Sequence, residues 1–224
     1  MQNGSGDVNN FGNLNETYIG VLFMILKDLH VSGWISSFLI AYALTGMADA
    51  GEPLNVVKNV TDRALTVLKD PQLQSNEKKQ ERIERLKQII NPMFDYEETA
   101  KRALGPHWRR RSPAEQREFI KLFRSFLEKV YSDRIDEYAG ESISVGREAI
   151  EGDFAEIDAI IVSSKGEESP VIFKLRHTGG KWLVYDAVVE NISIVNNYRS
   201  QFDRVIRTSS YEELVKKLRE KVAS

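Results

Sequence analysis

GGKWLVYDAVVENISIVNNYRSQF, residues 179–202, is the stretch that decides the fold of this chain of 224 residues. Its first part, residues 182–189, is rich in aromatic and β-branched residues and alternates as a β-strand does. In its second part, apolar residues recur at the spacing of an amphipathic helix, at Ile194, Val195, Tyr198 and Phe202. A strand that runs directly into such a helix predicts a sheet with that helix packed over one face, and the cover encloses either a core or an apolar cavity.

Period-two alternation predicts further strands before this one. The alternating apolar residues are Ile143 and Val145, then Ala155, Ile157, Ala159 and Ile161, then Val171, Phe173 and Leu175. Lys165-Gly166 and Gly179-Gly180 are turn signals between the strands. The pattern therefore predicts an antiparallel meander of about four strands.

Start and stop signals predict several helices. Asp70-Pro71 and Asn91-Pro92 are expected to end two helices, because the residue before a proline is driven out of the helical region. Three helices are expected to begin at a capping residue that is followed by Glu at the third position, in the pairs Asp95 and Glu98, Ser112 and Glu115, and Ser210 and Glu213. The predicted fold class is α+β, a curved antiparallel sheet wrapped by several helices.

Composition excludes several classes of function. A formal net charge of −2 is not the basic balance of a nucleic-acid-binding domain. The absence of cysteine excludes disulfides, thiolate metal sites and a cysteine nucleophile. The chain has no GxSxG elbow, P-loop, GxGxxG loop or paired-histidine metal motif, so we predict a protein that is not an enzyme and that uses no metal or cofactor.

The first fifty residues resemble a targeting segment. Lys27 precedes an apolar run at residues 34–44, and Ala48-Asp49-Ala50 is a small-x-small cleavage site. We expect a signal peptide over residues 1–50, cleaved after Ala50, with Met24 as an alternative start. A single domain is expected over residues 51–224. Retention of the apolar run as a membrane anchor is the alternative.

Two further segments carry a family resemblance. Together with residues 179–202, FDYEETAKRALGPHW at residues 94–108 and FRSFLEKVYSDRIDEY at residues 123–138 resemble the MlaC-type periplasmic phospholipid-binding proteins, also called toluene-tolerance auxiliary proteins. The resemblance runs from Pro53 to Leu218. It implies a periplasmic carrier of a phospholipid with two acyl chains. Such a carrier would shuttle lipid between an outer-membrane lipoprotein complex and an inner-membrane ABC transporter with its membrane-anchored substrate-binding subunit, and so maintain outer-membrane lipid asymmetry.

Under this resemblance the apolar excess becomes a candidate lipid pocket. We expect its lining to be Phe123, Leu127, Val130, Tyr131, Ile157, Ala159, Ile161, Phe173, Leu175, Tyr185, Tyr198 and Phe202. On the last strand we favour the wholly apolar side, which is made of Leu183, Tyr185, Ala187 and Val189, over the side that holds Asp186. A filled aromatic core is the alternative.

Charged residues add two expectations. Arg109, Arg110 and Arg111 are predicted to form a surface loop that attracts a lipid headgroup, a membrane or an acidic partner, with a merely solvated loop as the alternative. Asp186 lies within an apolar strand, and we predict a structural ion pair with Arg199. Two other functions remain open, an isomerase or dehydratase of the cone-shaped fold class with Asp186 as its base, and an interaction protein with a solid core.

Overall fold

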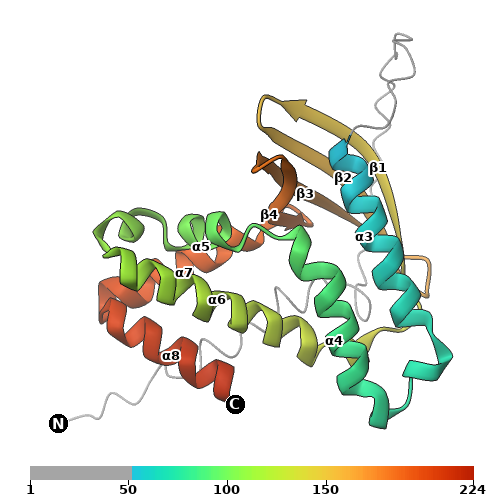
Figure 1. Cartoon of the computed structure of the whole chain (residues 1–224), viewed down its shortest axis with the longest axis horizontal. Coiled ribbons are helices and arrows are strands. Elements are labelled where there is room, and N and C mark those ends of the chain that lie inside the picture. The colour runs from blue at the N-terminus through green and yellow to red at the C-terminus, as the bar shows by residue number, and fades with distance from the viewer. Residues whose placement is uncertain (1–51) are drawn as a thin grey trace.

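The computed structural model describes residues 52–224 of the chain. The predicted signal peptide, its cleavage site and the alternative start at Met24 lie outside the described residues. The described part consists of six α-helices, several short 3-10 helices and one five-stranded antiparallel sheet (Figure 1). The α+β prediction is therefore confirmed.

The sheet is an open meander in the order β1-β2-β3-β4-β5, and each neighbouring pair is antiparallel. Its strands are β1 (Ser142–Glu151), β2 (Phe154–Val162), β3 (Glu168–Thr178), β4 (Lys181–Val189) and β5 (Ile192–Ser193). The sheet has one strand more than predicted, because the two-residue β5 folds back along the end of β4. Gly179 and Gly180 both have positive φ, at 57° and 73°, and make the predicted tight turn between β3 and β4.

An irregularity in β4 changes which residues face inward. Lys174 pairs with Asp186 but Leu175 pairs with Val184, so Tyr185 is an extra residue with no partner on β3. Val184 is buried before this bulge, and Ala187 and Val189 are buried after it. On the expected apolar side of β4, Ala187 and Val189 are therefore buried as expected, but the expectation is wrong for Leu183 and Tyr185, because one inserted residue moves the side chains that follow it to the other face.

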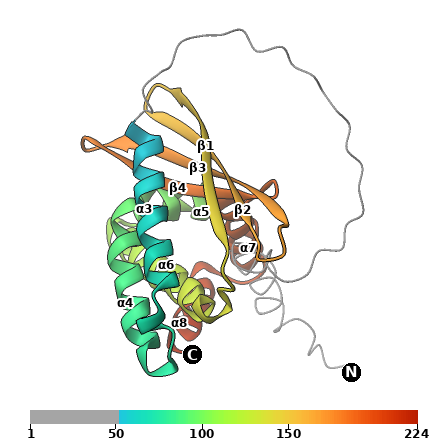
Figure 2. The same ribbon diagram turned by 90° about the vertical axis from the view of Figure 1, so that its right-hand side faces the viewer.

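The helix α3 crosses the covered face of the sheet (Figure 2). This N-terminal part of the described chain contains α3 (Glu52–Lys69), the 3-10 helices η1 (Pro71–Leu73) and η2 (Asn76–Lys78), α4 (Lys79–Ile90) and η3 (Asn91–Met93). Both proline stops are confirmed, since α3 ends before Asp70-Pro71 and α4 ends before Asn91-Pro92. Val57 of α3 is completely buried against the sheet, in contact with a cluster that includes Ile157 and Leu175.

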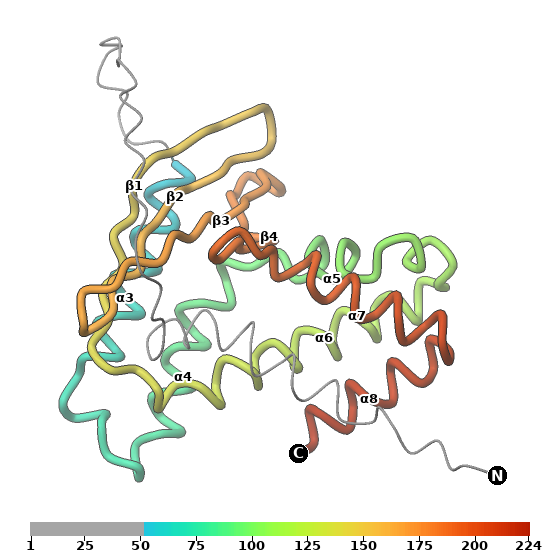
Figure 3. The backbone as a smooth tube through the Cα atoms, turned by 180° about the vertical axis from the view of Figure 1, so that it is seen from behind, coloured from blue at the N-terminus to red at the C-terminus, as the bar shows by residue number. Residues whose placement is uncertain are grey.

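The remaining helices form a separate layer beside the sheet (Figure 3). They are α5 (Tyr96–Leu104), the 3-10 helix η4 (Gly105–Arg110), α6 (Pro113–Asp133), the 3-10 helix η5 (Ile135–Glu137), α7 (Ile194–Thr208) and α8 (Tyr211–Ala223). The three predicted caps are confirmed, with Asp95, Ser112 and Ser210 each accepting a hydrogen bond from the backbone N–H three residues later. Ser112 and Glu115 form a complete capping box.

Aromatic side chains fill the centre of this helical layer. Phe123 meets both Tyr198 and Phe202 edge to face, with ring centroids 5.3 Å apart in each case. Phe119 and Phe126 extend the same cluster, and all five side chains are at most 1% exposed. Such pairs add to the free energy gained from burial itself. This part of the protein is therefore a solid aromatic core, separate from the sheet.

Arg176 of β3 joins the sheet to the helical layer. Its guanidinium lies 2.6 Å from the carboxylate of Asp95 and 3.3 Å from that of Glu98, two side chains that are almost completely buried at the start of α5. The backbone N–H of Asp95 also donates to the carbonyl of Val184 at 2.8 Å. The position of α5 against β3 and β4 therefore depends on a charged junction.

We predict that Arg176→Gln lowers the free energy of unfolding by about 2 to 3 kcal/mol, because it leaves the Asp95 carboxylate buried without its cation. Lys174→Gln, two residues earlier on the same strand, is the matched control. Lys174 pairs with Glu156, which is half exposed, so its loss should cost at most about 1 kcal/mol. Urea unfolding of both variants measures the difference, and equal losses would contradict the assigned role of Arg176.

Candidate functional site

An apolar cavity of about 240 Å³ lies between the sheet and the helices. Its walls come from α3, α4, η3, α5, α6 and the start of α7, and from the covered faces of β1 to β4. Most of the lining side chains are aliphatic or aromatic. Such a cavity suits a hydrocarbon ligand, because most of its surface is apolar and costs little to desolvate.

Most of the polar groups on the cavity wall are already hydrogen-bonded within the protein. The hydroxyls of Tyr96 and Tyr131 donate to the amide oxygen of Asn91 at 2.8 and 3.3 Å. The single O–H of Thr99 lies 2.8 Å from the carbonyl oxygen of Asp95 and 2.9 Å from that of Tyr185, and it donates to one of them or is shared between both. Burial raises the pKa of both tyrosines, which therefore remain neutral at physiological pH. The cavity thus offers few free polar groups to a ligand.

Four of the predicted pocket residues lie on this wall. Leu127 and Tyr131 come from α6, Ile161 from β2 and Phe173 from β3. The helix α6 and the hairpin of β2 and β3 therefore bring these side chains together. Their contact with a bound lipid stays a prediction.

The other eight predicted pocket residues lie elsewhere, and the expectation that they line the cavity is wrong. Phe123, Tyr198 and Phe202 belong to the aromatic core, and Val130 packs against that core. Ile157 and Leu175 are fully buried beneath α3. Ala159 lies in a small cluster on the sheet, and Tyr185 lies on the opposite face, under the guanidinium of Arg102.

Several wall residues were missed by the sequence analysis. They come from the first two helices and the segment that follows them, and they include Val60, Ala64, Leu65, Leu68, Leu86, Ile90, Met93 and Phe94. The helical spacing of α3 and α4 marks an apolar face on each helix. That spacing does not reveal what the face packs against, so the signal alone could not assign these residues to a cavity.

Asp186 is buried, but it does not pair with Arg199. Its carboxylate accepts a hydrogen bond from the hydroxyl of Ser193 at 2.6 Å and another from the backbone N–H of Val195 at 3.0 Å. Within residues 52–224 it forms no ion pair with any side chain. The predicted Asp186–Arg199 pair is therefore wrong, because the turn between β4 and α7 supplies donors much closer to the carboxylate.

Burial raises the pKa of Asp186 above its ordinary value of 3.8, and the hydrogen bonds from Ser193 and Val195 offset part of that rise. The carboxylate also lies on the wall of the apolar cavity. Its two oxygens are both engaged in holding the start of α7. Asp186 is thus a structural group at the edge of the cavity.

The three consecutive arginines have different environments. Arg109 and Arg110 end the 3-10 helix η4 and are exposed. Arg111 is only 21% exposed in its side chain, lies 3.3 Å from the carboxylate of Glu115 and stacks 4.5 Å above the ring of Tyr211. The prediction that all three arginines form a surface loop is therefore wrong for Arg111, which contributes to the packing of α6 and α8.

Residues 52–224 lack two features of other functional classes. None of the helices in this range is both long and apolar enough to span a bilayer. The same range contains no group of three His, Cys, Asp or Glu side chains placed to hold a metal ion.

Comparison with known proteins gives consistent matches. The family described as MlaC protein matches residues 58–220 of this chain. The chain is 28% identical over 166 residues to the toluene tolerance protein ttg2D of Pseudomonas putida. That match covers 73% of this chain and 77% of the relative. It is 24% identical over 135 residues to the intermembrane phospholipid transport system binding protein MlaC of Haemophilus influenzae. That match covers 58% of this chain and 63% of the relative.

A solved structure shares the fold. The phospholipid-binding protein from Ralstonia solanacearum, determined in complex with a phospholipid, superposes with a TM-score of 0.67 at 22% sequence identity. The match covers 77% of this chain and 98% of that chain. At this level of identity the likeness establishes the fold.

The raised pKa of Asp186 leads to a pH-dependence prediction. A carboxyl group with a higher pKa in the folded protein binds its proton more tightly when folded, so its contribution favours the folded state at low pH and is lost as pH rises through the window above 3.8. Asp186→Asn does not titrate. We therefore expect the stability of the wild type relative to Asp186→Asn to fall as pH rises from about 4 to about 7, measured by urea unfolding. A constant difference over that range would show that the pKa is not raised.

A second prediction separates the arginines of the η4 region. Arg111→Gln should lower the free energy of unfolding by about 1 kcal/mol, since it removes the cation above Tyr211 and the ion pair with Glu115. Arg110→Gln, its exposed neighbour, should stay within about 0.5 kcal/mol of the wild type. Thermal and urea unfolding of the two variants test this. If Arg111→Gln is as stable as the wild type, Arg111 has no structural role, and all three arginines are merely solvated.

Proposed function

This chain belongs to the MlaC family, and from that membership we propose that it is a phospholipid-binding transport protein whose apolar cavity holds acyl chains. The observation that carries the proposal is the cavity between α3, α4, α6 and the sheet, most of whose polar wall groups are already hydrogen-bonded. Each methylene that leaves water for such a site contributes about 0.8 kcal/mol. No bond has to be made or broken.

The size of the cavity bears on how a lipid enters. Ligand sites commonly measure about 300 to 1,000 Å³, and the cavity of about 240 Å³ is smaller. Two acyl chains therefore require its walls to separate. The wall formed by α3 and α4 is suited to this, because α4 is joined to the body through short 3-10 segments on both sides.

The wider role that we propose is transport between membranes. The H. influenzae relative is named as a binding protein of an intermembrane phospholipid transport system. By analogy, this chain would act in the periplasm, after removal of residues 1–50, and exchange lipid with an outer-membrane lipoprotein complex and an inner-membrane ABC transporter. The exposed Arg109 and Arg110 are candidates for contact with an acidic partner or an anionic membrane.

The enzyme alternative depends on Asp186 as a base, and its geometry does not favour that role. Both carboxylate oxygens accept hydrogen bonds that hold the turn into α7. A general base must lie within hydrogen-bond reach of the substrate proton, whereas this carboxylate is oriented toward Ser193 and Val195. The solid-core alternative describes the helical layer well, but it leaves the apolar cavity beside the sheet without a role.

Lipid extraction tests the proposed function. Protein purified from the periplasm should carry about one phospholipid per chain, quantified by mass spectrometry and phosphorus analysis. Ile161→Glu should abolish this retention, because Ile161 is 4% exposed and lines the cavity, where a carboxylate is strongly disfavoured. Ile160→Glu, one residue earlier on the opposite face and 41% exposed, should retain lipid.

A second variant controls for the possibility that Ile161→Glu loses lipid only because it unfolds. Ala64→Phe adds apolar volume to the cavity wall on α3 without adding charge, and it should reduce the retained lipid while the circular dichroism spectrum stays that of the wild type. Phospholipid retained in full by folded Ile161→Glu and Ala64→Phe proteins would refute the cavity as the acyl-chain site.

A further inference from the structure

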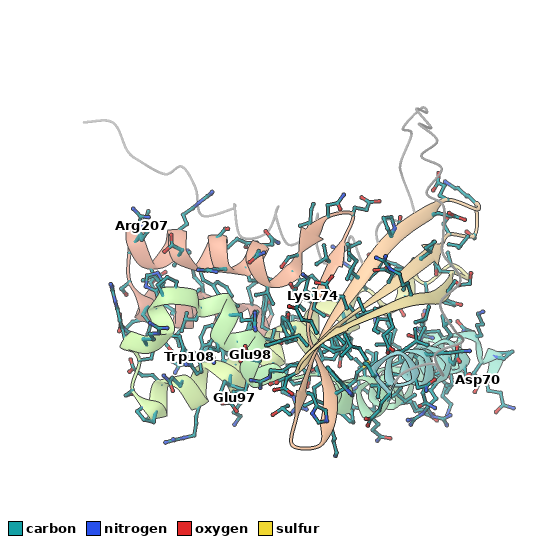
Figure 4. All side chains as sticks on the ribbon, turned by 90° about the horizontal axis from the view of Figure 1, so that it is seen from above. Asp70, Glu97, Glu98, Trp108, Lys174 and Arg207 are labelled. Atoms are coloured by element: carbon teal, nitrogen blue, oxygen red, sulfur yellow. The ribbon has the colours of Figure 1, made fainter. Side chains whose placement is uncertain are left out.

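A second hollow, of about 320 Å³, lies beside the apolar cavity. It is bounded by the end of α5, by η4, by α7 and by the uncovered side of β3 and β4. Five cationic side chains and one acid line it, namely Lys101, Arg102, Arg109, Lys174, Arg199 and Asp186. We call this hollow the basic crevice. Figure 4 shows Lys174 where the strands meet the helical layer and Trp108, another lining residue, on the helical side.

The acids near the basic crevice do not balance its charge. Glu98 is shared, since its carboxylate lies 2.7 Å from Arg102, 3.4 Å from Lys101 and 3.3 Å from Arg176 outside the crevice. Glu156 pairs with Lys174 at 2.7 Å, and Asp186 adds one negative charge, so three acids face the five cations of the crevice. The hollow therefore carries an excess of positive charge, which favours an anion.

Two of the arginines have no counter-ion among residues 52–224. Within the described part of the chain, neither Arg109 nor Arg199 makes an ion pair or a side-chain hydrogen bond. They come from different elements, η4 and α7, yet both line the basic crevice. Like charges gathered in one hollow are unfavourable unless a ligand of opposite charge joins them.

The backbone beneath Arg199 is shaped to receive it. Gly105 has a positive φ of 56°, and a Cβ at this position would lie 2.8 Å from the Nε atom of Arg199. Any larger residue would therefore push the guanidinium away. The glycine lets the arginine lie directly on the turn between α5 and η4, which holds its stem against the crevice wall.

We propose that the basic crevice binds a phosphate group, with Arg199 and Arg109 as its main ligands. Guanidinium groups match phosphate oxygens in a planar, bidentate geometry and stay charged at all physiological pH values. The side chains of Trp108 and Tyr185 also line the hollow.

The phosphate can come from two sources. The basic crevice and the apolar cavity share Asp186 and Val195 as lining residues, so the phosphate of a lipid whose chains enter the cavity lies within reach. In this form the inference rests on the proposed function. The other source is free inorganic phosphate, which does not depend on lipid binding.

The first experiment uses inorganic phosphate and lipid-free protein expressed as the full chain. Calorimetric titration should show one saturable site, and Arg199→Gln and Arg109→Gln should each weaken it by at least about tenfold, as expected for the loss of a charge-assisted hydrogen bond. Arg110→Gln is the matched control, because Arg110 lies next to Arg109 on η4 but does not line the basic crevice. Its affinity for phosphate should equal that of the wild type.

The second experiment distinguishes the sources by ³¹P NMR on lipid-loaded protein. If the headgroup occupies the basic crevice, Arg199→Gln shifts the resonance of the bound phospholipid, Arg110→Gln does not, and added inorganic phosphate no longer binds. If the site takes the free ion, phosphate binds equally with and without lipid, and the lipid resonance is unaffected.

The proposal is overturned if the arginine variants change neither phosphate affinity nor the lipid resonance, or if Arg110→Gln has the same effect as Arg199→Gln. The phospholipid content of each preparation is measured separately. If the protein retains phospholipid but shows no phosphate site, only this inference is refuted, and the proposed function stands. Phosphate bound by a protein that never retains lipid would refute the proposed function and leave the anion site in place.

Discussion

The buried carboxylate of Asp186 sets where the helical layer meets the sheet. A charge at this depth must be matched by nearby donors, and the turn after β4 brings the Ser193 hydroxyl and the Val195 N–H to it. To do so the chain places Glu190 and Asn191 at positive φ, 49° and 68°. The direction of α7 follows from this turn. One side of α7 then closes the apolar cavity at Val195, while Arg199 faces the basic crevice.

The protein separates the apolar surface that stabilises it from the apolar surface that is left open. The long helix α6 shows this division most clearly, since Phe119, Phe123 and Phe126 pack into the aromatic core while Leu127 and Tyr131 face the cavity. A solid core retains full dispersion contacts, whereas the atoms that line a cavity lose them. Stability therefore resides largely in the helical layer and beneath α3, so the region around the cavity is free to accommodate a ligand.

The bulge at Tyr185 creates two chemically distinct sides on one strand. Before it, Val184 is buried among the residues beneath α3, and after it Ala187 lines the cavity. The inserted Tyr185 points to the uncovered side, where Arg102 stacks 4.2 Å above its ring and Lys174 lies beside it in the basic crevice. Bulges often redirect side chains next to functional sites. Here the same few residues contribute both to an apolar wall and to a cationic one.

The sequence by itself determined the features that depend on local geometry and on family likeness. The caps at Asp95 and Ser112, the proline stops and the strand alternation involve residues only a few positions apart, so they can be predicted from the sequence. Tertiary structure alone decided which apolar side chains line the cavity, which partner Asp186 finds and which arginine is structural. The cavity lining and the position of Arg111 against Tyr211 depend on contacts between segments far apart in the chain, and the partners of Asp186 depend on the three-dimensional path of the turn after β4. A single inserted residue in β4 reverses the faces of the strand, and no periodicity within the strand itself reveals where that insertion falls.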